Sequence, residues 1–419
     1  PTSYADENGR NKVLQFTGTA GGTQAITFPN IEKTYHVLND SNSILTLTTG
    51  TGAATVTLAA GKDKMIYNDG SDEIHDALAN LAITTLATSG AVTLGAQATT
   101  GITVGGIPFY YGDTGSIYTH DVSGTDSTAQ YNTAYGLTAL DAITTGDNNT
   151  AIGHNAGGAI NTGASNTLVG YQAGRDITDD SNNVAIGFRA GSNLTESSNV
   201  AIGSDAARLG TSFTDSVVIG TSAIGTGVAT GTANIVIGKT AGEILTSASS
   251  NILVGHSAGQ ALTTGGDNIF IGQDAGDDHD AETNNLGIGK SSLGGSIAGG
   301  EYNVAIGNQA LDALTSSDMN TAVGYRSGSA ITTGDGNTLF GFESGLSITG
   351  AGAYNVCLGT AAGTLITTGV RNTFVGQAGY NFDTENDNVG MGHGALGGAI
   401  NGGEFNVAIG NYSLDALTS

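Results

Sequence analysis

One short pattern recurs through most of the chain and limits what it can fold into. Asn, two or three apolar residues and Gly are followed by two variable positions and a small residue, as in Asn149–Gly153 and Asn303–Gly307. The pattern occurs 17 times from Asn132 onward, with Ser216 once in place of Asn, at steps of 16, 17 or 18 residues. A period this short has no room for a helix pair or a propeller blade, but it matches one turn of a β-solenoid. We therefore predict an all-β fold with a parallel β-solenoid over residues 131–419.

Fixed positions within each turn predict how the solenoid is built. The residue four after each Asn is Gly in all 17 turns, which indicates a positive φ or a close backbone neighbour at the end of a strand. Two and three residues after the Asn, as at Leu168 and Val169, every turn has an apolar residue or Gly. These two positions face opposite sides of a strand, so both faces are expected to be buried. One face fills the coil, and the other is predicted to meet another copy of the chain.

A second apolar position lies about eleven residues after the Asn and is followed by turn residues, as in Ile143–Gly146 and Leu262–Gly265. It predicts a second short strand in each turn. The small residue seven after the Asn, such as Ala156, is expected to allow close packing, and the Asn residues are expected to hydrogen-bond along the stack as a ladder. With parallel strands about 4.8 Å apart, 17 turns would form a rod roughly 80 Å long.

A longer period is superimposed on the short one. Leu293–Ser316 and Leu396–Ser419 agree at 19 of 24 positions and lie 103 residues apart. The earlier copy continues into a further turn, whereas the later one stops at Ser419. We therefore expect the chain to be a piece of a longer polypeptide.

Before Asn132 the period is absent, and turn sequences such as Gly61-Lys-Asp separate short β-prone runs. This pattern predicts an N-terminal antiparallel β module over residues 1–80. One or two helical turns are expected near Ile74–Leu81, and residues 81–130 are expected to form a β-rich neck and solenoid cap. The predicted strands are Lys12–Phe16, Gln24–Phe28, Lys33–Leu38, Ile44–Thr48, Ala54–Leu58 and Lys64–Tyr67.

The charge and cysteine content exclude several functional classes. The chain has 12 basic and 37 acidic residues, and its net charge of −25 repels nucleic acids and anionic membranes. No apolar run approaches the ~18 residues of a membrane span. The single cysteine, Cys357, occupies an apolar position and is expected to be a buried thiol.

Two family resemblances add to this interpretation. Repeats such as Asn183–Gly187 and Asn199–Gly203 resemble the head repeats of YadA-type trimeric adhesins, which implies a left-handed parallel β-roll and a homotrimer. These turns are two or three residues longer than the adhesin repeat, so one corner must be larger. The segment Tyr35–Gly70 is similar to a β module frequent in bacteriophage tail fibres and other virion proteins, and this likeness implies a phage origin.

The sequence shows no catalytic constellation and no cofactor-binding motif. Of the seven His residues, His154, His256 and His393 follow the corner Gly of different turns and are too far apart to share a metal ion. One turn replaces the second apolar position with an acidic run. Its carboxylates are a candidate Ca²⁺ or Mg²⁺ loop, with a solvated acidic bulge as the alternative. The residues are Asp277, Asp278, Asp280 and Glu282.

These features favour a non-enzymatic structural protein. We expect a homotrimeric phage tail fibre or other virion appendage that contacts further virion proteins and spaces or presents host attachment, with a host glycan or protein as the partner. A bacterial trimeric surface adhesin is the alternative. A glycan-cleaving enzyme and an ice-binding solenoid are further classes, although paired Thr residues at the second apolar position occur in only some turns.

Overall fold

The computed structural model describes residues 12–19, 21–28, 33–49, 55–68, 74–76, 102–104, 107–111, 116–119, 128–295, 299–398 and 402–416. The chain divides into two compact units, Pro1–Ala96 and Gln97–Ser419. Every regular element in the described ranges is a β-strand, so the prediction of an all-β protein is confirmed.

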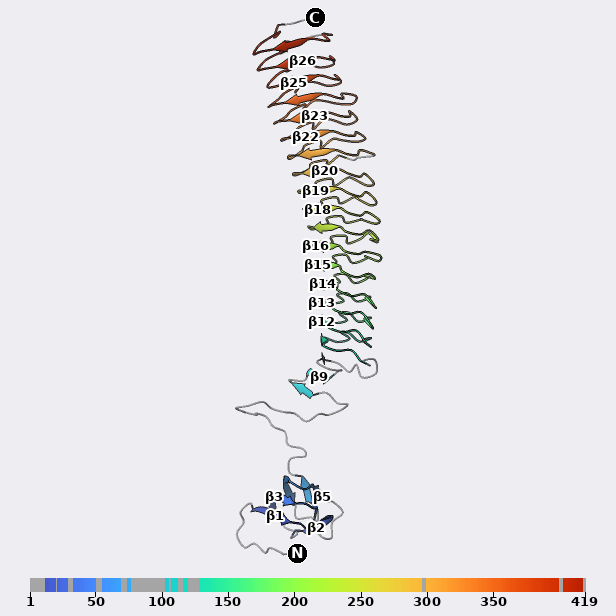
Figure 1. Ribbon diagram of the computed structural model, residues 1–419, viewed down its shortest axis with the longest axis vertical. Helices are drawn as coiled ribbons and strands as arrows, with labels where there is room; N and C mark the ends of the chain where they lie inside the picture. Colours follow the sequence, from blue (N-terminus) through green and yellow to red (C-terminus); the bar gives the residue numbers. More distant parts are fainter. Residues whose placement is uncertain are drawn as a thin grey trace. The chain divides into compact units, whose positions relative to one another are not determined.

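The first unit contains two small sheets, in which strands pair in the orders β1-β3-β6-β7 and β2-β4-β5 (Figure 1). The antiparallel pairs β3–β6, β6–β7 and β4–β5 agree with the predicted module. The first strand of each sheet instead pairs in parallel, β1 with β3 and β2 with β4. The strands are β1 (Lys12–Gly18), β2 (Thr23–Thr27), β3 (Lys33–Ser41), β4 (Ile44–Thr48), β5 (Val56–Leu58), β6 (Lys62–Asn68) and β7 (Ile74–Asp76).

Alternating apolar residues of these strands form the core of the first unit. Val37, Leu47 and Ile66 are fully buried, and the rings of Phe28 and Tyr35 lie 4.8 Å apart between centroids. The helical turn expected from Ile74 is wrong for the first three residues, which form β7. Pairing with β6 overrides their weak local preference, while residues 77–81 lie outside the described ranges.

The second unit begins with the antiparallel pairs β8–β9 and β9–β10 and continues as one long parallel ladder. The first three strands are β8 (Ile102–Val104), β9 (Ile107–Tyr111) and β10 (Ile117–Tyr118). Parallel pairing then runs from β10 to β27, with each strand in register with the next. This ladder confirms the predicted solenoid, and the strands stack directly over one another in Figure 1.

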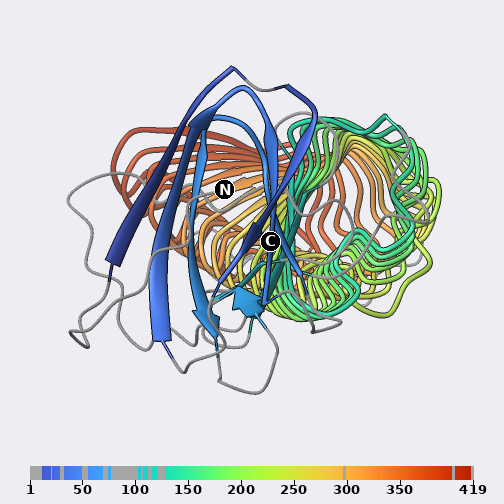
Figure 2. The same cartoon turned by 90° about the horizontal axis from the view of Figure 1, so that it is seen from below.

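Each turn contributes one strand of three residues, which begins directly after the Asn of the repeat. Figure 2, viewed along the stack, shows successive turns nearly superimposed, with a gradual drift from green to red. The strands are β11 (Thr133–Tyr135), β12 (Thr150–Ile152), β13 (Thr167–Val169), β14 (Val184–Ile186), β15 (Val200–Ile202), β16 (Val217–Ile219), β17 (Ile235–Ile237), β18 (Ile252–Val254), β19 (Ile269–Ile271), β20 (Leu286–Ile288), β21 (Val304–Ile306), β22 (Thr321–Val323), β23 (Thr338–Phe340), β24 (Val356–Leu358), β25 (Thr373–Val375), β26 (Val389–Met391) and β27 (Val407–Ile409).

The second strand expected in each turn is not formed in the described residues, which contain turns and bends there. Left-handed residues interrupt the extended backbone before the second apolar position, as at Thr138 and Leu140 with φ of 56° and 53°. The second apolar residue is nevertheless buried, as Ile143 and Ile160 show. Backbone bonds still join the turns there, since Thr144 donates to the carbonyl of Asn161 at 2.9 Å.

Candidate functional site

The Asn residues form a continuous buried ladder along the solenoid, as predicted. The backbone N–H of each repeat Asn donates to the side-chain oxygen of the equivalent residue one turn earlier, at 2.8–3.2 Å from Asn132 to Asn406. The first acceptor is the hydroxyl of Ser116, which begins a turn that the sequence pattern does not reveal. At Ser216 the hydroxyl replaces the amide oxygen and accepts from the N–H of Asn234 at 3.0 Å.

The Gly that ends each strand is required for two reasons. Its φ lies in a region that only Gly adopts readily, for example +146° at Gly255. A Cβ at Gly255 would also lie 2.2 Å from the carbonyl oxygen of Gly272 on the next turn. Both explanations that the sequence suggested for this invariant Gly, a positive φ and a close backbone neighbour, are therefore correct.

The two apolar positions of each strand have different environments. The residue two after the Asn points into the coil and is fully buried, as at Leu168, Leu253 and Phe270. The residue three after the Asn faces outward and stays partly exposed, for example Ile152 at 40% and Ile186 at 37%. The residue one after the Asn shares this outward face and is Thr, Val, Ile or Leu in every turn. Each strand therefore leaves an apolar outer face uncovered in the single chain, which we call the outer strand face.

Aromatic side chains stack on the surface directly after the corner Gly. The rings of Tyr171 and Phe188 lie 5.3 Å apart between centroids at 10°, and His154 stacks on Tyr171 at 5.4 Å. Tyr325 and Phe342 form a similar pair at 5.5 Å. These pairs occupy the same position in consecutive turns, so the solenoid period sets their stacking.

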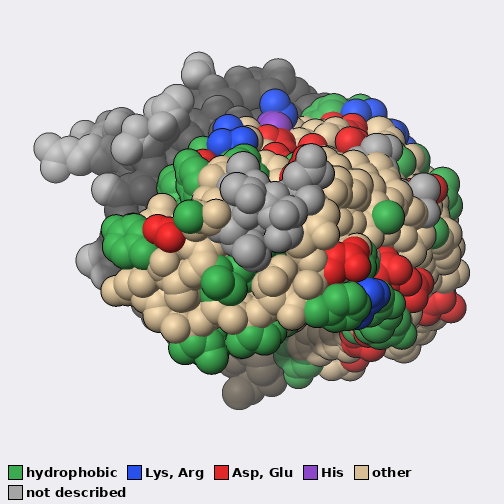
Figure 3. Space-filling view, turned by 90° about the horizontal axis from the view of Figure 1, so that it is seen from above, with side chains coloured by type: hydrophobic (Ala, Val, Ile, Leu, Met, Phe, Trp, Pro, Cys, Tyr) green, Lys and Arg blue, Asp and Glu red, His purple; other side chains and the backbone are tan. Residues whose placement is uncertain are grey.

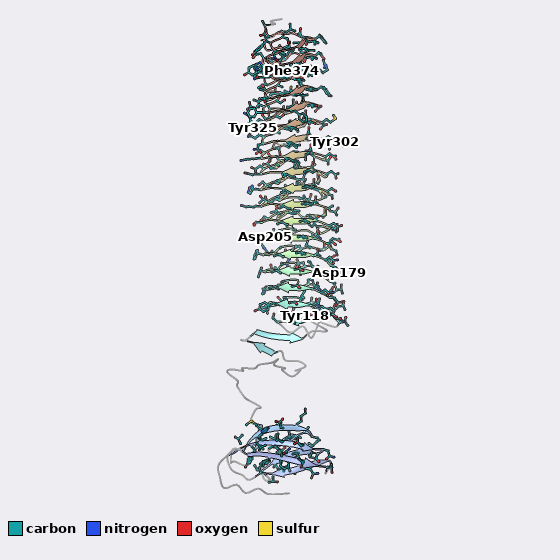
Figure 4. The ribbon with its side chains drawn as sticks, turned by 60° about the vertical axis from the view of Figure 1, so that its left-hand side comes forward. Tyr118, Asp179, Asp205, Tyr302, Tyr325 and Phe374 are labelled. Carbon is teal, nitrogen blue, oxygen red and sulfur yellow. The ribbon has the colours of Figure 1, made fainter. Side chains whose placement is uncertain are left out.

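Ion pairs accompany the aromatic pairs one residue further along each turn. Arg189 contacts Asp205 of the next turn at 2.8 Å, and its guanidinium carbon lies 4.7 Å from the ring centroid of Phe188. Arg326 contacts Glu343 of the next turn at 3.3 Å. Figure 4 places Asp205 and Tyr325 at one edge of the solenoid and Tyr302 at the opposite edge. We call the edge that contains Asp205 and Tyr325 the distal corner. It is formed by the residues five to twelve positions after each repeat Asn, beginning with the aromatic position.

Two surface hollows lie at the distal corner. The larger, the four-turn groove, has a volume of about 920 Å³ and crosses the turns that follow β21, β22, β23 and β24. Its lining includes Gln309, Asp312, Tyr325, Arg326 and Ser347. The smaller hollow, of about 350 Å³, is lined by Gln377, Tyr380, His393, Tyr412 and Asp415 among others. Neither hollow follows from the repeat pattern, because each depends on which side chains fill the variable positions of neighbouring turns.

The acidic turn after β19 does not gather its four candidate cation ligands. Glu282 is buried, and its carboxylate accepts the backbone N–H groups of Asp280 at 2.8 Å, Ala281 at 3.1 Å and Gly299 at 2.9 Å. Asp278 and Asp280 are exposed, whereas Asp277 is half-buried. Within the described ranges no group of three or more His, Cys, Asp or Glu side chains is placed to hold a metal ion. The Glu282 carboxylate therefore fixes the loop itself.

His279 occupies the second apolar position of this turn and is fully buried. Its ring packs edge-on against Phe270 at 4.7 Å, and neither ring nitrogen has a hydrogen-bond partner. Burial lowers the pKa of His279 to about 3, so the ring stays neutral at neutral pH. Phe382, 103 residues later, packs in the same way on Phe374 at 5.2 Å. A phenyl ring therefore fits this position.

Replacing His279 by Phe is expected to stabilise the protein by about 1–3 kcal/mol at pH 7, because two unpaired buried polar atoms are removed. The stability difference should grow as the pH falls from 6.5 towards 3, by about 1.4 kcal/mol per pH unit. In that range the unfolded wild type binds a proton at His279 that the folded protein excludes. Urea unfolding of both proteins at several pH values measures this difference.

Asp277 does not disturb that comparison. Burial and the charge of Asp278 raise the pKa of Asp277 from its ordinary value of 3.8 to about 6. Protonation of Asp277 therefore stabilises the folded state increasingly as the pH falls from 6 to 3.8. The effect is common to both proteins and cancels in their difference. A difference that does not change with pH would contradict the burial of a neutral His279.

The remaining residues singled out in the sequence lie where the repeat places them. His154, His256 and His393 are exposed on separate turns. Cys357 is a buried free thiol, and burial raises its pKa to about 12. The described residues contain no helix with the length and apolar character needed to cross a membrane.

The distal corner and the outer strand face are thus two surfaces on which a function could rest. The sequence showed that the second apolar position is interrupted in the turn that contains His279. It did not show that the His279 ring nitrogens lack hydrogen-bond partners. No family model matches this chain, and no curated protein matches it.

Proposed function

We propose that this protein is the shaft of a bacteriophage fibre, a non-enzymatic homotrimeric rod that spaces or presents a host-attachment site on the virion. The observation that carries the proposal is the outer strand face, which is apolar in every turn and uncovered in the single chain. Large exposed apolar surfaces on soluble proteins mark interaction sites.

The dimensions of this face suit an extended association between chains. A strip roughly 80 Å long and 10 Å wide covers on the order of 800 Å², which is what one partner contributes to a stable interface. Figure 3, which views the molecule from above, shows hydrophobic side chains in several separate groups, some of them beside charged side chains. A second copy of the chain repeats its outward apolar residues at the same spacing, once per turn. The outer strand faces of two copies can therefore pack together turn by turn. The number three and a left-handed coil come from the resemblance to the adhesin repeats.

The ladder of Asn side chains and the stacked core support a mechanical role. Every turn is joined to its neighbours by backbone bonds, buried apolar columns and side-chain amides, so each turn stiffens the next. In the part of the chain that the structure describes, no group of three or more His, Cys, Asp or Glu side chains is placed to hold a metal ion. The phage assignment, as against a bacterial surface adhesin, is supported by the N-terminal module and its resemblance to virion β modules.

Antibodies raised against the solenoid test this assignment when intact phage particles and host cells are imaged by electron microscopy. We expect labelled rods on the tail or capsid of the virion. Label found only on the surface of uninfected bacteria would overturn the phage assignment and favour the adhesin.

A further inference from the structure

The four-turn groove has the shape of a site for an extended ligand. Its lining comes from four consecutive turns, which at about 4.8 Å per turn span roughly 14 Å along the solenoid. It is open along its length, with about 920 Å³ of space. A compact cofactor is normally enclosed on most sides, whereas an open groove of this length suits a short stretch of a linear polymer.

The polar groups along the groove are of several kinds. Gln309 supplies an amide, Asp312 a carboxylate, and Ser329 and Ser347 supply hydroxyls. Burial raises the pKa of Asp312, a half-buried carboxylate, and outweighs the opposing effects of a backbone hydrogen bond and of the charge of Arg326. A carboxylate of this kind accepts hydrogen bonds from ligand hydroxyls, and amides and serines donate and accept them.

An aromatic ring completes the lining. Tyr325 is 43% exposed, and its ring is held in place by stacking on Phe342 at 5.5 Å. Tyrosine presents an apolar ring beside a polar hydroxyl, so it packs against the C–H groups of a ligand that also carries hydroxyls. The smaller hollow repeats the combination of an amide, a carboxylate and tyrosines, in Gln377, Asp415, Tyr380 and Tyr412. Both hollows lie at the distal corner, away from the outer strand face.

From this chemistry we infer that the four-turn groove binds an uncharged oligosaccharide of about three sugar residues, and that the smaller hollow binds the same class of ligand. A carbohydrate offers both the hydroxyls and the C–H faces that the lining complements. Polyanionic glycans are disfavoured, because the chain carries a net charge of −25. This inference deepens the proposed function by naming the ligand class of a host-attachment rod, and it rests on that function for its biological meaning.

Binding of the full chain to an array of immobilised neutral hexose and N-acetylhexosamine trimers to hexamers tests the inference, with polysialic acid and hyaluronan as anionic comparisons. We expect binding to one or more neutral glycans and none to the anionic polymers. On the bound glycan, Tyr325→Ala and Asp312→Asn should each weaken binding in the four-turn groove about tenfold, as the loss of one well-made contact predicts. The double variant should abolish binding in the four-turn groove and leave the smaller hollow as the remaining site.

Tyr171→Ala is the matched control, because Tyr171 holds the same position in its turn and stacks on Phe188 at 5.3 Å outside both hollows. It should leave binding unchanged, and all variants should keep the wild-type Tm. Absence of binding to every neutral glycan, or an equal loss in Tyr171→Ala, would overturn the inference. The mass of the chain in solution and the labelling of virions are measured separately. Glycan binding by a monomer would therefore support the ligand proposed for the four-turn groove while contradicting the proposed homotrimer.

Discussion

Replacing Gly255 by Ala is expected to lower the free energy of unfolding by more than about 4 kcal/mol. The added Cβ would lie 2.2 Å from the carbonyl oxygen of Gly272, and the backbone φ of +146° is strained for any residue with a side chain. The clash is with the backbone of the next turn, so no side chain can rotate away to relieve it. Urea unfolding followed by far-UV circular dichroism measures the loss.

Gly266→Ala provides the matched control in the neighbouring part of the same turn. Gly266 does not have a left-handed φ, and the one nearby atom for an added Cβ is the Ser249 carbonyl oxygen at 3.1 Å. We expect a change below about 1 kcal/mol, since only a small local adjustment is needed. Equal losses of stability in the two variants would show that backbone geometry is not the reason for Gly at the end of each strand.

Replacing Asn268 by Ala is expected to cost about 3 kcal/mol or more, the second of the large effects. The Asn268 side chain accepts the backbone N–H of Asn285 at 3.0 Å and donates to the Glu282 carbonyl at 2.8 Å. Asn268 is fully buried, so truncation leaves a donor and an acceptor unpaired away from water. Thermal and urea unfolding of the variant measure the cost.

Asn268→Ser separates the ladder from simple packing. Ser216 shows that a hydroxyl keeps the acceptor for the next turn, since Asn234 donates to it at 3.0 Å. The Ser variant should therefore recover part of the stability lost in the Ala variant, despite its similar size. A Ser variant as unstable as the Ala variant would argue against the hydrogen-bonded ladder.

Much of this fold follows from the sequence, because the repeat couples local and long-range structure. A Gly in all 17 turns and an apolar residue before it define where each strand ends, and the structure places β11–β27 there. In the first unit, alternation and turn residues predict β4 with its observed bounds, Ile44–Thr48. The Asn ladder follows from a polar residue repeated at the start of a buried strand.

Other features required the three-dimensional arrangement. Residues such as Tyr302 and Arg371, with φ of 59° and 57°, adopt the left-handed conformation at non-Gly positions, so their identity gives no warning. Left-handed residues in the middle of the turn, such as Thr138 and Leu140, explain why the second apolar position lies in a turn. The four-turn groove combines variable residues from turns that lie 17 or 18 residues apart, and no local pattern marks such residues as neighbours. Sequence reasoning therefore predicted the solenoid but not the groove.

The mass of the chain in solution, measured by sedimentation equilibrium, tests most directly whether the outer strand face joins chains. We expect three times the 41.6 kDa of one chain, and a lower mass for Ile219→Asp, which places a charge on that face. A wild-type mass of a single chain across the concentration range would contradict the proposed trimeric rod.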